Sequence, residues 1–406
     1  MSTGIFNTSG FTTDLVKKSF AQSITRLMPN GQAPLFGMTA MLPTEIAVQV
    51  EHGFFTKTML FPSMNLDAAV ANATDTTFTV ASTTDLLPGM LMRAESTGEV
   101  VILNSILNAT QVSVGRGIGS TAAAIADNVN LYQVGNAFEE SSVRPNALQI
   151  NPVRITNLTQ IFRNTWALSG TAQATQVIAG ETTVAENRQD CAAFHAADIE
   201  KALFFGTKSQ GTRNGQPFRT MDGLRNIILN PAYYPASYGG VVNNTTAGAT
   251  TNFTQLETAL NPTFNQSTDP KVGNERVLFV GGGARQVINN IGRLNATYQI
   301  QNGATSYGLQ FGQFNIARGS FRMIEHPLFN SNSDWTKYAM AVDLSTFRVA
   351  YLGGRNTMKQ DFNMGGQVVD NGIDAVGGTI TTELTCVVKN PPANAIITNL
   401  TAAAAG

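Results

Sequence analysis

The longest helical pattern in the sequence runs from Thr183 to Phe205, and it constrains the fold more than any other segment. Glu181 and Glu186 favour the start of a helix, because acidic side chains interact well with its N-terminal dipole. Gly206 is a typical C-terminal stop. Apolar side chains at helical spacing form one broad face: Val184, Cys191, Phe194, Ile199 and Leu203. We expect a long helix that serves as the spine of the fold.

Residues 75–135 carry short β-strand candidates about every ten residues, separated by turn residues. The candidates are TTFTV, MLMRA, GEVVIL, TQVSV and VNLYQV. This spacing is typical of a small antiparallel barrel or curled sheet. Extended sequence flanks the module on both sides, so residues 46–150 predict a long two-stranded excursion with a β module at its tip.

The other parts of the chain alternate helical and strand patterns, which predicts an α+β fold. A helix near Phe253–Leu260 precedes a strand at 276–280, a turn of three glycines and a second helix. The C-terminal region indicates an alternating strand, a proline break and a short last strand. We expect further strands at 321–326, 338–344 and 347–352.

The N-terminal residues and two polar stretches have less regular patterns. Residues 14–27 predict a helix in an N-terminal arm, which Pro29-Asn30-Gly31 then breaks. The Gly- and Asn-rich stretches 206–218 and 231–251 are expected to be long loops.

Charged residues are scarce. Lys, Arg, Asp and Glu make up 13% of the chain, against roughly 25% in an average soluble domain. Because the cores of protein interfaces are depleted in charge, we expect neighbouring protein to cover much of this surface. The net charge is −1 without a basic stripe, so only weak, non-specific contact with nucleic acid is expected. Neither a signal peptide nor a membrane span is predicted, and a cytoplasmic site of synthesis is expected.

Two glycine clusters are candidates for a nucleotide site. Gly115, Gly117 and Gly119 follow a strand candidate, but their spacing is G-x-G-x-G, and no lysine follows as a P-loop needs. Gly281–Gly283 join a strand to a helix, but the residues about 20 positions later are neutral where a dinucleotide site needs an acid. We expect a turn in the β module at the first cluster and tight strand-to-helix packing at the second.

Residues for catalysis or metal binding are not clustered in the sequence. The three histidines, His52, His195 and His326, lie far apart, and His195 is expected to be a packed or interfacial side chain. Cys191 and Cys386 are expected to be free buried thiols. We therefore predict no enzyme activity, cofactor or metal site.

The spine helix and the loop after it resemble tailed-bacteriophage major capsid proteins of the Hong Kong 97-type fold. The matching residues are Ile199-Glu200, Ala202, Leu203 and Gly206, followed by Arg219, Met221, Gly223 and Leu224. The β module, with LLPGM, GEVV and VGRG, and the C-terminal GGTITTELTCVVKNPPANAIITNL are also similar to this family.

The resemblance implies a subunit of several parts that assembles as hexamers and pentamers into an icosahedral shell around double-stranded DNA. The expected parts are an N-terminal arm (1–45), an extended loop (46–150), a peripheral domain (151–230 and 345–378) with the spine helix, and an axial domain (231–344 and 379–406). A shell of this kind forms in the host bacterial cytoplasm and becomes the virion capsid.

Partners follow from the same resemblance. They are further copies of the chain, a portal and a possible decoration protein. No long helical segment precedes the arm, so we also expect a separate scaffolding protein and little or no N-terminal processing. Some relatives crosslink a loop lysine to an asparagine. Lys57 is the only lysine of the excursion, but no specific acid accompanies it, and a crosslink is not expected.

Charged residues are the candidates for contacts between subunits. Arg116 is expected to point outward or toward a neighbour, and Glu140 and Arg144 are spaced to pair locally or across subunits. The selected residues are Lys57, Arg116, Glu139, Glu140 and Arg144 in the loop, and Arg188, Glu200 and Lys201 on the polar side of the spine. An ordinary solvated charge is the alternative at each position.

Three other functions stay open. An encapsulin-like shell would enclose cargo proteins in place of a genome. A nucleotide-dependent enzyme would use Gly115–Gly119 or Gly281–Gly283. A tail or fibre protein would form tubes or trimers.

Overall fold

The computed structural model has an α+β fold, as the sequence predicts, and divides into two compact units, residues 55–153 and the remainder of the chain. The structure describes residues 34–39, 43–57, 62–147, 152–175, 183–234, 242–265, 274–294, 301–306, 309–363 and 374–403. The helix expected at 14–27 lies outside these residues. Among the described residues, no helix is both long and apolar enough to cross a membrane.

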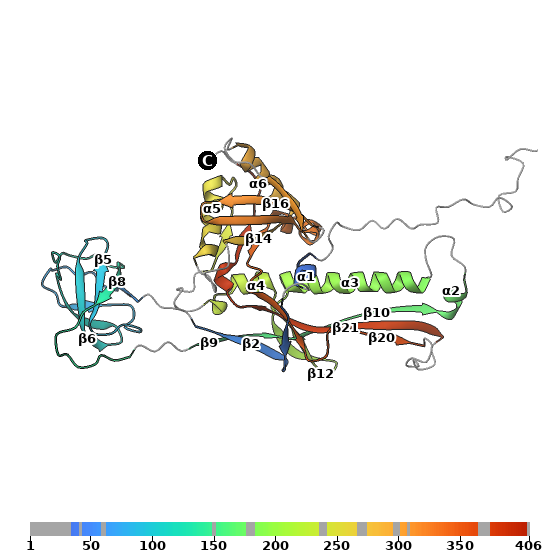
Figure 1. The fold of residues 1–406 in the computed structure, drawn as a ribbon, viewed down its shortest axis with the longest axis horizontal. Helices are drawn as coiled ribbons and strands as arrows, with labels where there is room; N and C mark the ends of the chain where they lie inside the picture. The colour runs from blue at the N-terminus through green and yellow to red at the C-terminus, as the bar shows by residue number, and fades with distance from the viewer. Residues whose placement is uncertain are drawn as a thin grey trace, which may run out of the picture. The chain divides into compact units, whose positions relative to one another are not determined.

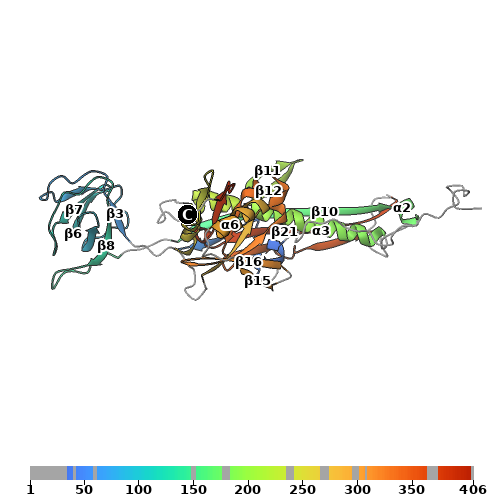
Figure 2. The same cartoon turned by 90° about the horizontal axis from the view of Figure 1, so that it is seen from above.

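Residues 63–136 form a small antiparallel β-barrel (Figures 1 and 2), so the expected β module is confirmed. The strand order is β3-β8-β5-β6-β7-β4, and a bridge between Leu66 and Val80 joins the two edges. Met64, Phe78, Met92 and other buried apolar side chains fill the interior. The strands are β3 (Ser63–Asn65), β4 (Thr77–Thr79), β5 (Met90–Ala94), β6 (Val100–Asn108), β7 (Gln111–Gly115) and β8 (Asn130–Asn136).

The excursion that leads to this barrel is less regular than the sequence predicts. Its two sides pair where β2 (Glu51–Thr56) meets β9 (Val153–Leu158). Residues 137–147, which were expected to continue the strand, contain no strand. The stretch has several polar residues and a proline, and Ser141 adopts a positive φ of 62°, which interrupts extended backbone.

A five-stranded sheet and the spine helix form one half of the larger unit. Helix α3 (Thr183–Phe205) has the predicted bounds and lies along β10 and β21 in both views (Figures 1 and 2). The order is β1-β19-β21-β10, with β20 also paired to β21. The boundary expected at residue 379 falls inside the continuous strand β21. The strands are β1 (Glu45–Ala47), β10 (Gln160–Ser169), β19 (Phe347–Leu352), β20 (Met358–Phe362) and β21 (Ala375–Val388).

The polar stretch at 206–218, expected to be a loop, contains most of a β-hairpin. Strands β11 (Ser209–Arg213) and β12 (Gln216–Thr220) pair in antiparallel register. Asn214 and Gly215 connect them with φ angles of 51° and 73°. Consecutive positive φ angles at Asn-Gly give the tight turn that suits the twist of a hairpin, and this dipeptide was the available sequence signal.

A mixed seven-stranded sheet forms the other half of the larger unit. Its order is β13-β22-β18-β14-β17-β16-β15. Helices α5 (Phe253–Leu260) and α6 (Gly282–Leu294) pack on it around Leu278, Phe314 and other buried side chains. The strands are β13 (Asn244–Thr246), β14 (Glu275–Val280), β15 (Gln301–Ser306), β16 (Leu309–Ile316), β17 (Gly319–Glu325), β18 (Ala339–Val342) and β22 (Ala395–Thr398).

One continuous apolar core joins the two halves of the larger unit. It contains Phe204 from the spine helix, Phe279 from β14, Phe347 from β19 and Leu35 from the short helix α1 (Pro34–Thr39). Two other short helices are α2 (Gly170–Ala174) and α4 (Leu224–Leu229). The spine helix therefore contributes to a core shared with the seven-stranded sheet.

Candidate assembly surfaces

Arg116 points into the barrel unit, so its expected outward orientation is wrong. Its side chain is 6% exposed, and its Nε and Nη2 atoms each lie 2.7 Å from an oxygen of Glu99, which is fully buried. Arg116 also donates to the carbonyl oxygens of Asn72 and Asp75. The backbone N–H groups of Gly117 and Ala123 donate to Glu99. The buried Glu99–Arg116 ion pair thus fixes the backbone of the glycine cluster.

The electrostatics of this pair match its geometry. Burial alone raises the pKa of Glu99, but the Arg116 guanidinium and the two N–H donors outweigh it and hold that pKa below its ordinary value. The Glu99 carboxylate in turn raises the pKa of Arg116. Gly117 and Gly119 adopt positive φ, and residues 120–136 after them contain no helix. The turn expected at Gly115–Gly119 is confirmed, and its arginine is occupied by a carboxylate of the same unit.

Glu200 also points inward and does not lie on the polar side of the spine helix, so that expectation is wrong. Its carboxylate is 1% exposed and accepts a hydrogen bond from His326. Lys201 is exposed and lies 3.3 Å from Asp198. Arg188 pairs with Asp361 of β20 and lies over the Trp166 ring. Lys201 and Arg188 therefore leave charge at the surface, whereas Glu200 belongs to the core.

The other selected loop residues lie at the surface. Lys57, Glu139, Glu140 and Arg144 are all exposed. Within the described ranges, Glu140 and Arg144 do not form an ion pair with each other. Pairing across subunits stays a prediction.

Several large apolar side chains are exposed although the sequence pattern did not indicate them. Phe194 on α3 is 65% exposed and Val143 is 89% exposed. Tyr132 and Val134 both lie on the outside of β8, two positions apart, so they share one face of the strand. Single exposed apolar side chains are common, whereas neighbours on one face, such as Tyr132 and Val134, provide apolar area for contact with other protein. The alternation along β8 was a usable signal for Tyr132 and Val134.

Phe194 corrects the expected apolar face of the spine helix. Buried positions along α3 include Cys191, His195, Ile199 and Leu203, each four residues apart, together with Glu200 and Phe204. His195 lies within hydrogen-bond distance of Asn164 and Thr382, which satisfies both ring nitrogens. The expectation of a packed histidine is confirmed, and Phe194 is displaced to the outer surface.

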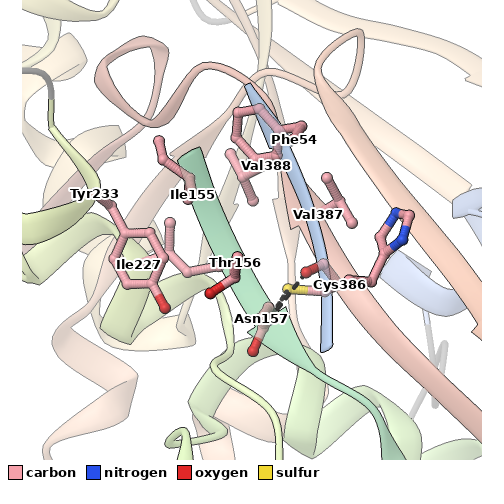
Figure 3. Close-up of a pocket in the computed structure, with 10 residues that line it drawn as sticks. Phe54, Ile155, Thr156, Asn157, Ile227, Tyr233, Cys386, Val387 and Val388 are labelled. Atoms are coloured by element: carbon pink, nitrogen blue, oxygen red, sulfur yellow. Dashed lines mark hydrogen bonds between the residues drawn. The ribbon is translucent and has the colours of Figure 1, made fainter. Parts of the chain in front are cut away.

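A small pocket contains the buried thiol of Cys386 (Figure 3). Its Sγ donates to the carbonyl oxygen of Asp222, and the Asn157 amide lies beside it. Burial raises the pKa of the Cys386 thiol, so the thiol stays protonated rather than becoming a nucleophile. The pocket has a volume of about 10 Å³, which is just enough for one water molecule.

A larger polar pocket of about 410 Å³ lies near Arg154 and Lys208. The Lys208 ammonium donates to the carbonyl oxygen of Thr156 at 2.9 Å, and Arg154 lies 3.5 Å from Glu51. Both cations therefore have partners within the subunit. In the described part of the chain, no three His, Cys, Asp or Glu side chains come together as a metal site.

The second glycine cluster packs tightly, as the sequence predicts. A Cβ atom on Gly281 would lie 2.4 Å from the carbonyl oxygen of Thr336. The N–H groups of Gly282 and Gly283, at the start of α6, already donate to Asn330 and Thr336 side chains. The N–H groups that a phosphate would need as donors therefore already have hydrogen-bond partners within the subunit.

The barrel has its own apolar core, apolar side chains are exposed on it and on α3, and charge is scarce, which agrees with a protein that associates with other protein. The sequence profile of the SU10 major capsid protein family matches residues 7–401. The chain therefore belongs to the SU10 major capsid protein family, and the resemblance to phage capsid proteins is confirmed.

One relative and two solved structures illustrate the similarity. The major capsid protein of Pseudomonas phage PaMx41 is 36% identical over 407 residues, covering 98% of this chain and 96% of that protein. A structure of Mycobacterium phage Bobi has a TM-score of 0.48 at 11% identity, covering 97% and 99% of the two chains. The holo-SrpI encapsulin complex from Synechococcus elongatus PCC 7942 has a TM-score of 0.43 at 10% identity, covering 62% and 78%.

Proposed function

We propose that this capsid protein assembles as hexamers and pentamers into an icosahedral shell of the Hong Kong 97 type around double-stranded DNA. The observation that carries the proposal is the barrel unit, which has its own core and yet exposes Tyr132, Val134 and Val143. These side chains gain from burial against another copy of the chain. The scarcity of charge agrees with a surface that is covered by neighbours.

The parts of the subunit take different roles in this proposal. The barrel and its flanks form the extended loop that reaches a neighbour, with Lys57, Glu139, Glu140 and Arg144 as its polar contacts. The five-stranded sheet and α3 form the peripheral domain. Arg188 and Lys201 lie on the polar side of α3. The seven-stranded sheet and its helices form the axial domain.

The role is structural and not enzymatic, without a cofactor. Assembly takes place in the host bacterial cytoplasm, with a separate scaffolding protein, a portal and a possible decoration protein as partners. Contact with packaged DNA is weak and non-specific, because the net charge is −1 and basic residues are dispersed along the chain.

Expression of the chain, alone and with candidate scaffolding proteins, tests the proposal by negative-stain microscopy. Closed shells, hexamers or pentamers support it. Tubes or trimers would indicate a tail or fibre protein, and a chain that stays monomeric under all these conditions would contradict assembly.

Two further measurements separate the remaining alternatives. Shells isolated from infected cells should absorb strongly at 260 nm, whereas an encapsulin-like shell with protein cargo should not. Equilibrium dialysis with ATP and NAD should show no binding at millimolar ligand; saturable binding would favour the nucleotide-dependent enzyme.

A further inference from the structure

The short helix α1 is attached to the spine helix through its backbone (Figure 1). Helix α1 begins at Pro34, so the N–H groups of Leu35 and Phe36 have no partner inside their own helix. Both N–H groups donate to the Glu200 carboxylate, Leu35 at 2.9 Å to Oε1 and Phe36 at 2.7 Å to Oε2. One side chain of α3 therefore caps the start of α1.

His326 fixes the position of that carboxylate. The N–H of Leu328 donates to Nδ1 of His326 at 3.1 Å, so Nδ1 is the acceptor and Nε2 carries the proton. Nε2 lies 2.7 Å from Oε1 of Glu200 and donates to it. The His326 side chain is fully buried, and the ring packs against Phe204 and Phe329. Its rotation is thereby restricted.

The same site holds an apolar anchor. Leu35 is fully buried in the core that joins the spine helix to the seven-stranded sheet. A carboxylate with two acceptor oxygens beside an apolar pocket binds the first two N–H groups of a helical turn, and the pocket takes up the leucine that carries the first of them. This recognition uses backbone atoms, so it depends little on the polar side chains of the bound segment.

We infer that Glu200 and His326 form a docking site for residues 34–39, which anchors the N-terminal arm to the subunit. Glu200 is the clamp, and His326 is a positioning residue that acts through Glu200. The site determines where the arm attaches, and release of this one carboxylate frees the turn while the rest of the core is kept. This inference concerns the subunit itself and does not depend on shell formation.

Hydrogen–deuterium exchange of the full chain as unassembled subunits tests the inference. Glu200→Gln has one acceptor oxygen in place of two, so one N–H group loses its partner. Hydrogen bonds to a charged group contribute about 1.5–3 kcal/mol. We therefore expect about tenfold to hundredfold faster exchange in peptides that cover residues 34–39. Lys201→Gln is the matched control on the adjacent, exposed position and should leave this exchange unchanged.

His326→Phe keeps an aromatic ring among Phe204 and Phe329 but removes the Nε2–H donor. It should also accelerate exchange at 34–39, and it should add little when combined with Glu200→Gln, because both changes act on one contact. It also serves as the second variant if Glu200→Gln does not fold.

Two results would overturn the inference. One is unchanged exchange at 34–39 in both variants. The other is faster exchange spread evenly over α3 and the seven-stranded sheet, which would make Glu200 an ordinary core residue. Since the measurement uses unassembled subunits, its outcome is separate from the outcome of the shell experiment.

Discussion

Nδ1 of His195 lies 2.7 Å from Oδ1 of Asn164, and the Asn164 amide nitrogen donates to Asp198. Because the NH2 group of the Asn164 side chain faces Asp198, its Oδ1 atom faces His195. Nδ1 of the neutral His195 ring is therefore the donor. Nε2 then lies 2.7 Å from the Thr382 hydroxyl. One histidine thus connects the spine helix to β10 and β21.

This relationship predicts an acid-sensitive subunit. Burial lowers the pKa of His195, and Asp198 offsets this only in part. The unfolded chain then takes up a proton near pH 6.5, whereas the folded chain takes it up only at a lower pH. Stability should therefore be lost as the pH falls below that value, by at most about 1.4 kcal/mol per pH unit. Urea unfolding of unassembled subunits between pH 5 and 8 measures it.

The control for His195 is His195→Gln, which keeps hydrogen-bonding groups but does not titrate. Its stability should depend less steeply on pH below 6.5 than that of the unmodified chain. Parallel curves for the two proteins would show that His195 does not contribute to the acid sensitivity.

The buried Glu99–Arg116 pair predicts a large effect of Arg116→Met on the barrel. Removing one partner leaves the Glu99 carboxylate buried without its counter-ion, a change that costs about 3–5 kcal/mol in other proteins. Hydrogen–deuterium exchange in the full chain should show lower protection across residues 62–136. Arg93→Met is the matched control, because the Arg93–Glu95 pair is exposed and worth about 0–1 kcal/mol. Equal effects of both substitutions would contradict the structural importance of the buried pair.

Gly281→Ala should destabilise the seven-stranded sheet. The new Cβ would meet the Thr336 carbonyl oxygen at 2.4 Å, and forced backbone shifts of this kind cost about 1–3 kcal/mol. Gly353→Ala provides the comparison, since its Cβ would meet no atom within 4 Å. Thermal unfolding should show a lower midpoint for Gly281→Ala alone. A midpoint unchanged from the original chain would mean that the turn relaxes freely.

Phe194→Ser should impair assembly without weakening the subunit. The side chain is 65% exposed, and surface changes usually alter stability by less than about 0.5 kcal/mol. If a neighbouring copy covers Phe194, fewer shells should form at a given protein concentration, as sedimentation would measure. Ala192→Ser, at another exposed position of α3, is the control. Normal assembly of Phe194→Ser would remove this position from the proposed contacts.

Local sequence patterns predicted those helices and strands whose apolar residues, at regular spacing, are the ones that become buried. The bounds of α3 and α5, and strands such as β5 and β19, follow from apolar spacing and from turn residues at their ends. The barrel was also predictable, because turns recur at regular intervals along residues 75–135. In these segments, neighbours in the sequence supply most of the information.

The wrong orientations of Glu200 and Phe194 depend on residues that are distant in the sequence. Glu200 is buried because the backbone of α1, about 165 positions earlier, and His326, 126 positions later, meet its carboxylate. His195 replaces Phe194 on the inner face because Asn164 and Thr382 satisfy the ring from two strands. Residue type alone predicts an exposed Glu200 and a buried Phe194. No local sequence pattern reveals the distant residues that reverse this placement.

Strand β21 has a mechanical consequence for the subunit. Ten successive residue pairs, from Ser169↔Ala375 to Gln160↔Leu384, join it to β10, and further pairs join its end to β19. A stretching force along β21 would load these pairings side by side rather than opening them one after another. We therefore expect β10 and β21 to resist a force along the strands more strongly than a force that pulls them apart from one end.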